Sequence, residues 1–140
     1  MLRVIRRVSQ KGPLELVPTF LGAHAVPPEF ESSARYVNHV VCDMLPAVAK
    51  EGLAEFVDVF CEAGYFSPEE SETVLSAAES FGLKTKIHAN QMGRTGGVEV
   101  AAKVRALTAD HLDCVSPDEI ERMKKCGTLA VLAPGSNFYL

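Results

Sequence analysis

The sequence lacks the features that mark a membrane protein or a nucleic-acid-binding protein. No run approaches the roughly eighteen apolar residues that a membrane span requires, and arginines interrupt the start of the chain where a signal peptide would need an apolar segment. The formal net charge is −4, and we interpret the one basic cluster, which begins at Arg3, as a solvated surface segment. We therefore expect a cytoplasmic protein that binds neither nucleic acid nor membrane.

Closely spaced cysteine pairs are also missing. The four cysteines show no C-x-x-C spacing, which disfavours a zinc ribbon. We expect them to be buried or partly buried free thiols in a reducing compartment. The chain has 140 residues, of which 47% are hydrophobic and 23% are charged, as in an ordinary globular domain.

What the sequence does contain is an alternation of strand-like and helix-like segments. Short apolar or β-branched runs predict strands at residues 14–23, 56–60, 84–88, 109–112 and 128–133. Apolar stripes and capping patterns predict helices at residues 31–50, 68–81, 98–105 and 117–126. Ser67 and Ser116 each precede a proline and two acids, which is typical of a helix N-terminus. Pro46 should kink or restart the first helix.

Five consecutive strand–helix steps predict an α/β fold with a parallel sheet and strands buried on both faces. The strand ends recur at spacings near the roughly thirty residues per unit of a (βα)8 barrel. Two architectures remain open, a small doubly wound domain and an incomplete (βα)8 TIM-type barrel with about five βα units. The apolar residues 138–140 indicate a chain that stops within a loop.

Three of the four histidines lie where a strand-like run meets a loop: His24, His88 and His111. Parallel α/β enzymes build their active sites from side chains at the carboxyl ends of strands. Neutral imidazole in that position can bind zinc or iron or transfer protons. The alternatives are structural roles: a backbone hydrogen bond that satisfies His88, a loop anchor for His24, and support of a neighbouring metal ligand for His111. His39 falls within a predicted helix and is expected on the surface.

Several motifs occur in one order along the chain. They are FLGAHAVPPE at 20–29, VDVFCE at 57–62, IHANQ at 87–91, ADHL at 109–112 and LAPG at 132–135. Together they resemble the imidazolonepropionase family of the amidohydrolase superfamily over essentially the whole chain. The resemblance implies a metal-dependent hydrolase barrel. Residues 1–140 would then be a partial amidohydrolase barrel domain, covering strands three to seven and lacking the N- and C-terminal parts.

The resemblance also implies roles for single residues. His88 matches the metal ligand of strand five, for one zinc or iron ion per active site. Gln91 occupies a position where the family has Glu or Gln; an amide cannot take up a proton, so Gln91 would orient substrate or water. His111 would then shuttle a proton or polarise the scissile carbonyl, and His24 would contact the substrate's propionate. Asp58 and Glu62 receive no role, and we expect one to point inward and the other outward.

The implied reaction is hydrolysis of 4-imidazolone-5-propanoate to N-formimidoyl-L-glutamate in histidine catabolism. Residues 1–140 alone should be inactive, since most metal ligands would lie elsewhere. The implied partners are this small-molecule substrate and either a second copy, as a homodimer, or the missing barrel half. The alternative from another class is a stand-alone five-stranded α/β domain that binds a small anion or a protein without catalysis. It requires a covered edge at Leu140.

Overall fold

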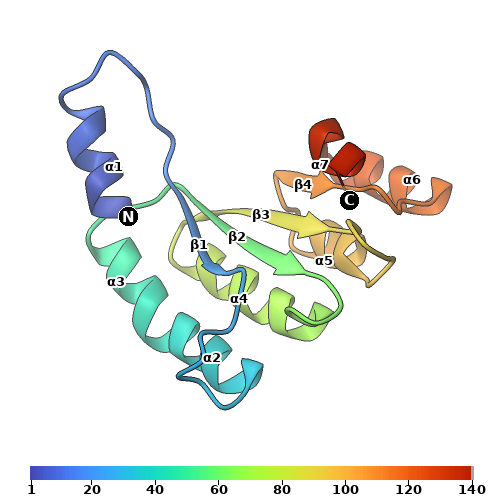
Figure 1. The fold of residues 1–140 in the computed structure, drawn as a ribbon, viewed down its shortest axis with the longest axis horizontal. Coiled ribbons are helices and arrows are strands. Elements are labelled where there is room, and N and C mark those ends of the chain that lie inside the picture. Colours follow the sequence, from blue (N-terminus) through green and yellow to red (C-terminus); the bar gives the residue numbers. More distant parts are fainter. Residues whose placement is uncertain (140) are drawn as a thin grey trace.

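The computed structural model describes residues 1–139, with Leu140 outside the described residues, and its centre is one parallel sheet (Figure 1). Neighbouring strands of the sheet follow one another in chain order. They are β1 (Thr19–Ala23), β2 (Phe56–Cys61), β3 (Lys84–Ala89), β4 (Thr108–His111) and β5 (Leu129–Val131). A doubly wound sheet reverses its strand order at a switch point, whereas a (βα)8 barrel keeps chain order. The fold is therefore the incomplete barrel.

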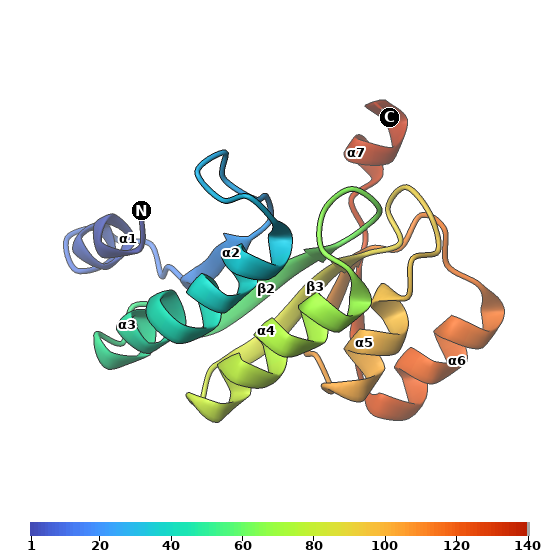
Figure 2. The same ribbon diagram turned by 90° about the horizontal axis from the view of Figure 1, so that it is seen from below.

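The helices that connect the strands lie on one side of the sheet, as Figures 1 and 2 show from two directions. They are α2 (Ser33–His39), the π-helical turn η1 (Val40–Met44), α3 (Leu45–Lys50), α4 (Pro68–Ser80), α5 (Gly97–Lys103) and α6 (Pro117–Cys126). Two short helices flank this unit, α1 (Leu2–Ser9) before β1 and α7 (Pro134–Tyr139) after β5. The arrangement matches the outer helical ring of a barrel.

The two faces of the sheet differ in chemistry because side chains alternate along each strand. In β2, Val57, Val59 and Cys61 are fully buried. A Cβ added at Gly97 of α5 would lie 2.6 Å from the Cβ of Ala89 and 3.4 Å from that of Cys61, so these side chains face the helices. The alternate residues, which include Asp58, face the other way. The face turned away from the helices therefore carries Asp58 together with aromatic side chains, since the Phe60 ring lies 6.2 Å from that of His88.

Two helix starts are fixed as the sequence predicts. Ser67 caps α4 and Ser116 caps α6, each followed by proline in the first turn. Each serine also forms a capping box, with Glu70 and Glu119 respectively. A cap of this kind is worth about 1 kcal/mol. Helix α4 follows β2 and helix α6 follows β4, so each cap fixes the end of the loop that leaves the carboxyl end of a strand.

Most strand and helix positions agree with prediction to within a few residues. Pro46 lies in the first turn of α3, and Met44 and Leu45 before it keep a helical backbone, so the expected restart of the helix does not occur. Four features differ from prediction. The first strand begins at Thr19 and not at residue 14, and helix α1 has no counterpart in the predicted elements. β5, expected to be buried, is exposed along its length; within residues 1–139 it is an edge strand that pairs with β4 alone. Helix α7 includes residues 138 and 139, where a loop was expected.

The cysteines are free thiols, as predicted. Cys61 is buried and Cys114 and Cys126 are half-buried, but Cys42 is exposed, because it lies on the outer side of η1. Among the described residues, no helix has the length and apolar character needed to cross a membrane.

Candidate active site

The three strand-end histidines converge on one place. His24 directly follows β1, His88 lies near the end of β3, and His111 is the last residue of β4. The ring centres of His24 and His88 are 4.7 Å apart, and those of His88 and His111 are 5.0 Å apart. Residues that are far apart in the chain are thus neighbours, because parallel strands place their carboxyl ends at the same edge.

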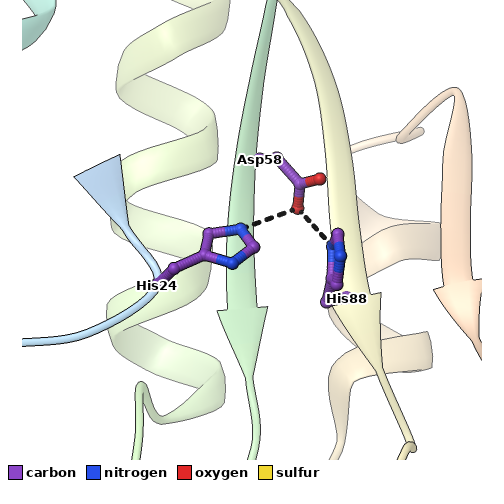
Figure 3. A group of neighbouring side chains, drawn as sticks. All are labelled: His24, Asp58 and His88. Atoms are coloured by element: carbon purple, nitrogen blue, oxygen red, sulfur yellow. Dashed lines mark hydrogen bonds and ion pairs between the residues drawn. The ribbon is translucent and has the colours of Figure 1, made fainter. Parts of the chain in front are cut away.

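A buried carboxylate joins two of these imidazoles (Figure 3). The Oδ1 atom of Asp58 lies 3.0 Å from Nδ1 of His88, within hydrogen-bond distance, and 3.4 Å from Nε2 of His24. The Asp58 side chain is only 2% exposed. Sequence reasoning gave this residue no role. The available signal was an acid in the middle of an apolar strand, since a buried carboxylate is costly unless it is paired.

The expectation that Asp58 and Glu62 point in opposite directions was wrong. Asp58 and Glu62 are 1% and 3% exposed, and both are turned to the interior. Residues an even number of positions apart along a strand share a face, so the period of two favours this result.

The protonation equilibria of the Asp58–His88 pair are coupled. Burial alone would raise the pKa of Asp58, but its contacts with His24 and His88 outweigh burial and lower that pKa below its ordinary value. Burial alone would lower the pKa of His88, and the hydrogen bond and charge of Asp58 outweigh it and raise that pKa. Asp58 is therefore ionised at neutral pH and favours a proton on the facing His88 nitrogen.

His111 reaches the cluster through an unusual backbone. Strand alternation would place it on the side of Ala109, facing the helices. Instead, His111 and Leu112 have φ of 78° and 63°, in the left-handed region that costs non-glycine residues energy. Its Nδ1 atom is buried and has no hydrogen-bond partner among residues 1–139. Burial and then the nearby His88 lower the pKa of His111, so its imidazole is neutral at neutral pH and able to accept a proton.

Glu62 holds the loop that carries Gln91. Its Oε2 accepts hydrogen bonds from the backbone N–H groups of Gln91, at 3.1 Å, and of Met92, at 3.0 Å. Its Oε1 accepts from the backbone N–H of Ala63, at 3.1 Å. The Gln91 side chain donates to the hydroxyl of Ser136 in α7, at 3.3 Å. Sequence reasoning missed Glu62 as the anchor of this loop, because its partners are backbone groups of another strand end.

A third buried carboxylate, that of Glu119, ties together the loops after β3 and β4. Glu119 accepts from the Asn90 amide at 2.9 Å, from the Arg94 guanidinium at 3.0 Å and from the Ser116 backbone at 2.7 Å. Asn90 has φ of 54° and is fully buried. These bonds hold the ends of β3 and β4 in register, and therefore hold His88 beside His111.

His39 lies outside the cluster, as predicted for a surface residue. Its Nδ1 is 2.7 Å from Oδ2 of Asp43 one helical turn later, and the two side chains are 40% and 66% exposed.

The clustered residues fit a transition-metal ion. One donor atom from each of His24, Asp58 and His88 lies within 4.8 Å of the others. Imidazole nitrogen and carboxylate oxygen are ligand types that zinc and iron accept. Within residues 1–139, the buried Nε2 of His24 makes no hydrogen bond and has only the 3.4 Å approach of the Asp58 carboxylate, so it is available as a donor atom. The site is therefore a possible metal centre.

Comparisons with known proteins agree with this fold and site. No protein-family model matches the chain. Imidazolonepropionase from Flavobacterium johnsoniae is 44% identical over 100% of this chain, which covers 34% of that enzyme. The enzyme from Caldanaerobacter subterraneus subsp. tengcongensis is 48% identical with the same coverage. The enzyme from Paraburkholderia phymatum is 48% identical, with 35% of its length covered. The chain thus spans about a third of the length of the curated relatives it matches.

Solved structures match the fold at low sequence identity. A Xaa-Pro dipeptidase crystallised with methionine in its active site aligns with a TM-score of 0.62 and 17% identity, over 93% of this chain and 38% of its own. An uncharacterized protein aligns with a TM-score of 0.63 and 15% identity, over 93% of this chain and 39% of its own. Both show a like arrangement of strands and helices within a longer chain.

The parallel strands in chain order, with helices between them and imidazoles at their carboxyl ends, define this chain as part of a (βα)8-type barrel. The sequence comparison is narrower than the fold comparison. The chain is homologous to imidazolonepropionases along its whole length and corresponds to about a third of them.

Proposed function

We propose that residues 1–140 are five βα units of a barrel domain of a cytoplasmic, metal-dependent cyclic amidohydrolase. Its reaction is hydrolysis of 4-imidazolone-5-propanoate to N-formimidoyl-L-glutamate. The observation that carries the proposal is the convergence of His24, His88 and His111 at the carboxyl edge of the sheet, beside the buried Asp58. The whole-chain similarity to imidazolonepropionases supports this reaction over others performed on barrels.

His88 is the residue of this chain that would hold the metal, zinc or iron. A bound ion of this kind supplies Lewis acidity for the attack of water on the ring amide. His24 and Asp58 lie close enough to join or support such a site. A catalytic zinc site needs about three protein ligands, so segments outside these residues would complete the set.

His111 is suited to proton transfer. Its imidazole is neutral at neutral pH, and its buried Nδ1 has no partner in the described part of the chain. In the reaction, water adds to the ring's carbonyl carbon and the ring C–N bond breaks. The carbon keeps the water's oxygen as a carboxylate, the leaving nitrogen gains one of the water's protons, and the other proton is released to solvent. His111 would accept a proton from the water and deliver it to that nitrogen.

His24 and Gln91 would position the substrate. His24 is partly exposed beside His88, where its imidazole could donate a hydrogen bond to the substrate's propionate. Gln91 sits on the loop that Glu62 fixes, and its amide can donate and accept but cannot act as a base. Orientation of substrate or water is therefore its role.

The exposed edge of the sheet favours association over a stand-alone domain. A stand-alone domain would need a covered edge near the end of the chain; Leu140 itself lies outside the described residues. Leu129 and Val131 of β5 are 61% and 41% exposed, and Leu132 is 70% exposed. An apolar edge strand of this kind pairs readily with another chain. We propose that the remaining part of the barrel, or a second copy of this chain, covers it.

A chimera tests the proposal. The matched third of the Flavobacterium johnsoniae enzyme is replaced by residues 1–140, and loss of imidazolone absorbance is measured after loading with zinc or iron. We expect turnover that is lost with His88→Ala and kept with His39→Ala, because His39 is a surface residue. A well-folded, metal-loaded chimera without turnover would contradict the proposed function. Residues 1–140 alone should give no measurable turnover.

A further inference from the structure

We propose that Asp58 is a positioning residue that holds neutral His88 in the tautomer with its proton on Nδ1. The Nε2 atom is then free as the atom that binds the metal. The inference rests on the proposed function in that it concerns how this chain presents its metal ligand. A separate observation supports it: Oδ1 of Asp58 lies 3.0 Å from Nδ1 of His88.

The register of the sheet places Asp58 deeper than the histidine it contacts. Asp58 is paired with Lys86 across β2 and β3, whereas His88 is paired with Phe60. Asp58 therefore starts two residues closer to the amino ends of the strands. Active sites of barrels lie at the carboxyl ends, so Asp58 approaches His88 from the side opposite to the substrate.

The exposed fraction of the two side chains increases in the same direction, from the amino toward the carboxyl ends of the strands. The Asp58 side chain is 2% exposed, and the His88 side chain is 25% exposed. The two nitrogens of an imidazole point away from each other, so a ring whose Nδ1 meets a buried carboxylate turns its Nε2 elsewhere. A neutral imidazole has a single N–H, and a facing carboxylate stabilises that proton on Nδ1 by a charge-assisted hydrogen bond. A carboxylate behind a metal-binding histidine commonly fixes its tautomer and orientation in this way.

A direct role for Asp58 as metal ligand makes a different prediction. An ion placed among His24, Asp58 and His88 would bind His88 through Nδ1, the atom that faces the carboxylate. The proton of neutral His88 would then lie on Nε2. The tautomer of His88 therefore separates the two roles, and no enzymatic activity is needed to read it.

The test is a long-range 15N–1H NMR correlation of the 140-residue chain labelled in histidine, recorded without metal at a pH where His88 is neutral. We expect a protonated Nδ1 and an unprotonated Nε2 on His88. In the chimera described above, whose remaining segments would supply the other metal ligands, addition of zinc should then shift the Nε2 resonance of His88. A His88 protonated on Nε2, or zinc binding at Nδ1, would overturn the proposal. This measurement requires no variant and so does not depend on how a variant folds.

Variants extend the test. Asp58→Asn should increase the share of the Nε2–H tautomer in the 140-residue chain and weaken zinc binding to the chimera by about 10- to 100-fold. The matched control is Asp43→Asn, which changes the exposed His39 pair, 2.7 Å long, and should leave both readouts unchanged. Unchanged tautomer and affinity in Asp58→Asn would overturn the proposal. If the Nδ1–H tautomer is present and zinc added to the chimera shifts neither nitrogen of His88, the proposed metal function fails while the position of Asp58 stands.

Discussion

Two histidine–aspartate pairs occupy opposite kinds of environment in this molecule. His39 and Asp43 lie one helical turn apart on the outer side of the chain, with side chains 40% and 66% exposed. His88 and Asp58 come from neighbouring strands, with side chains 25% and 2% exposed. Water screens the first pair, so it contributes little. The second pair lies where an unpaired carboxylate would be costly. The same two residue types thus form an exposed surface pair in one region and part of the candidate active site in the other.

The largest expected difference between the pairs concerns catalysis. In the chimera described above, His88→Ala should lower kcat/KM at least about 1000-fold, because a lost metal ligand removes several kcal/mol of transition-state stabilisation. His39→Ala should leave kcat/KM within about twofold. Equal losses in both variants would show that the two regions do not differ in function.

Stability should separate the pairs next. Asp58→Ala removes the acceptor of a buried hydrogen bond, and we expect a loss of about 1.5 to 3 kcal/mol in the free energy of unfolding. Asp43→Ala removes an exposed ion pair and should cost below about 1 kcal/mol. Urea unfolding of both variants beside the parent chain measures the difference. A smaller cost for Asp58→Ala than for Asp43→Ala would refute the distinction.

Glu62 sharpens the comparison, because it is a buried carboxylate whose partners are backbone N–H groups of Ala63, Gln91 and Met92. Glu62→Gln keeps one carbonyl oxygen and loses the other acceptor, which should cost about 1 kcal/mol. Amide hydrogen exchange at these three residues should accelerate, while exchange in α4 stays as in the parent. Unchanged exchange at all three would mean that Glu62 does not hold the loop.

The smallest effect concerns pH, measured on the metal-free chain. The lowered pKa of Asp58 contributes stability above the ordinary carboxyl range, and this is lost as pH falls through the folded-state pKa. The raised pKa of His88 contributes stability below its ordinary pKa, and this is lost as pH rises through the folded-state pKa. The stability excess of the parent over Asp58→Asn should therefore be greatest between about pH 4 and about pH 6.5. A pH-independent difference would contradict the coupling.

The positions of His24, His88 and His111 could be anticipated from the sequence, because each follows a recognisable strand and parallel strands end at one edge. The role of Asp58 could not. Its partner His88 is 30 residues away, and the contact depends on the register between β2 and β3. A shift of that register by a single residue would turn the two side chains to opposite faces. Prediction of the buried strand near residue 129 failed for a related reason, since burial depends on neighbours and not on the strand's own composition.

The sequence by itself determined the alternation of strands and helices, the capped starts of α4 and α6, and the placing of histidines at strand ends. These are local properties, set by side-chain periodicity and by hydrogen bonds within a few residues. Only the tertiary structure decided that Asp58 faces His88 and that the left-handed backbone at His111 turns its ring toward the same face. Both depend on contacts between distant segments, whose geometry is fixed when the sheet assembles.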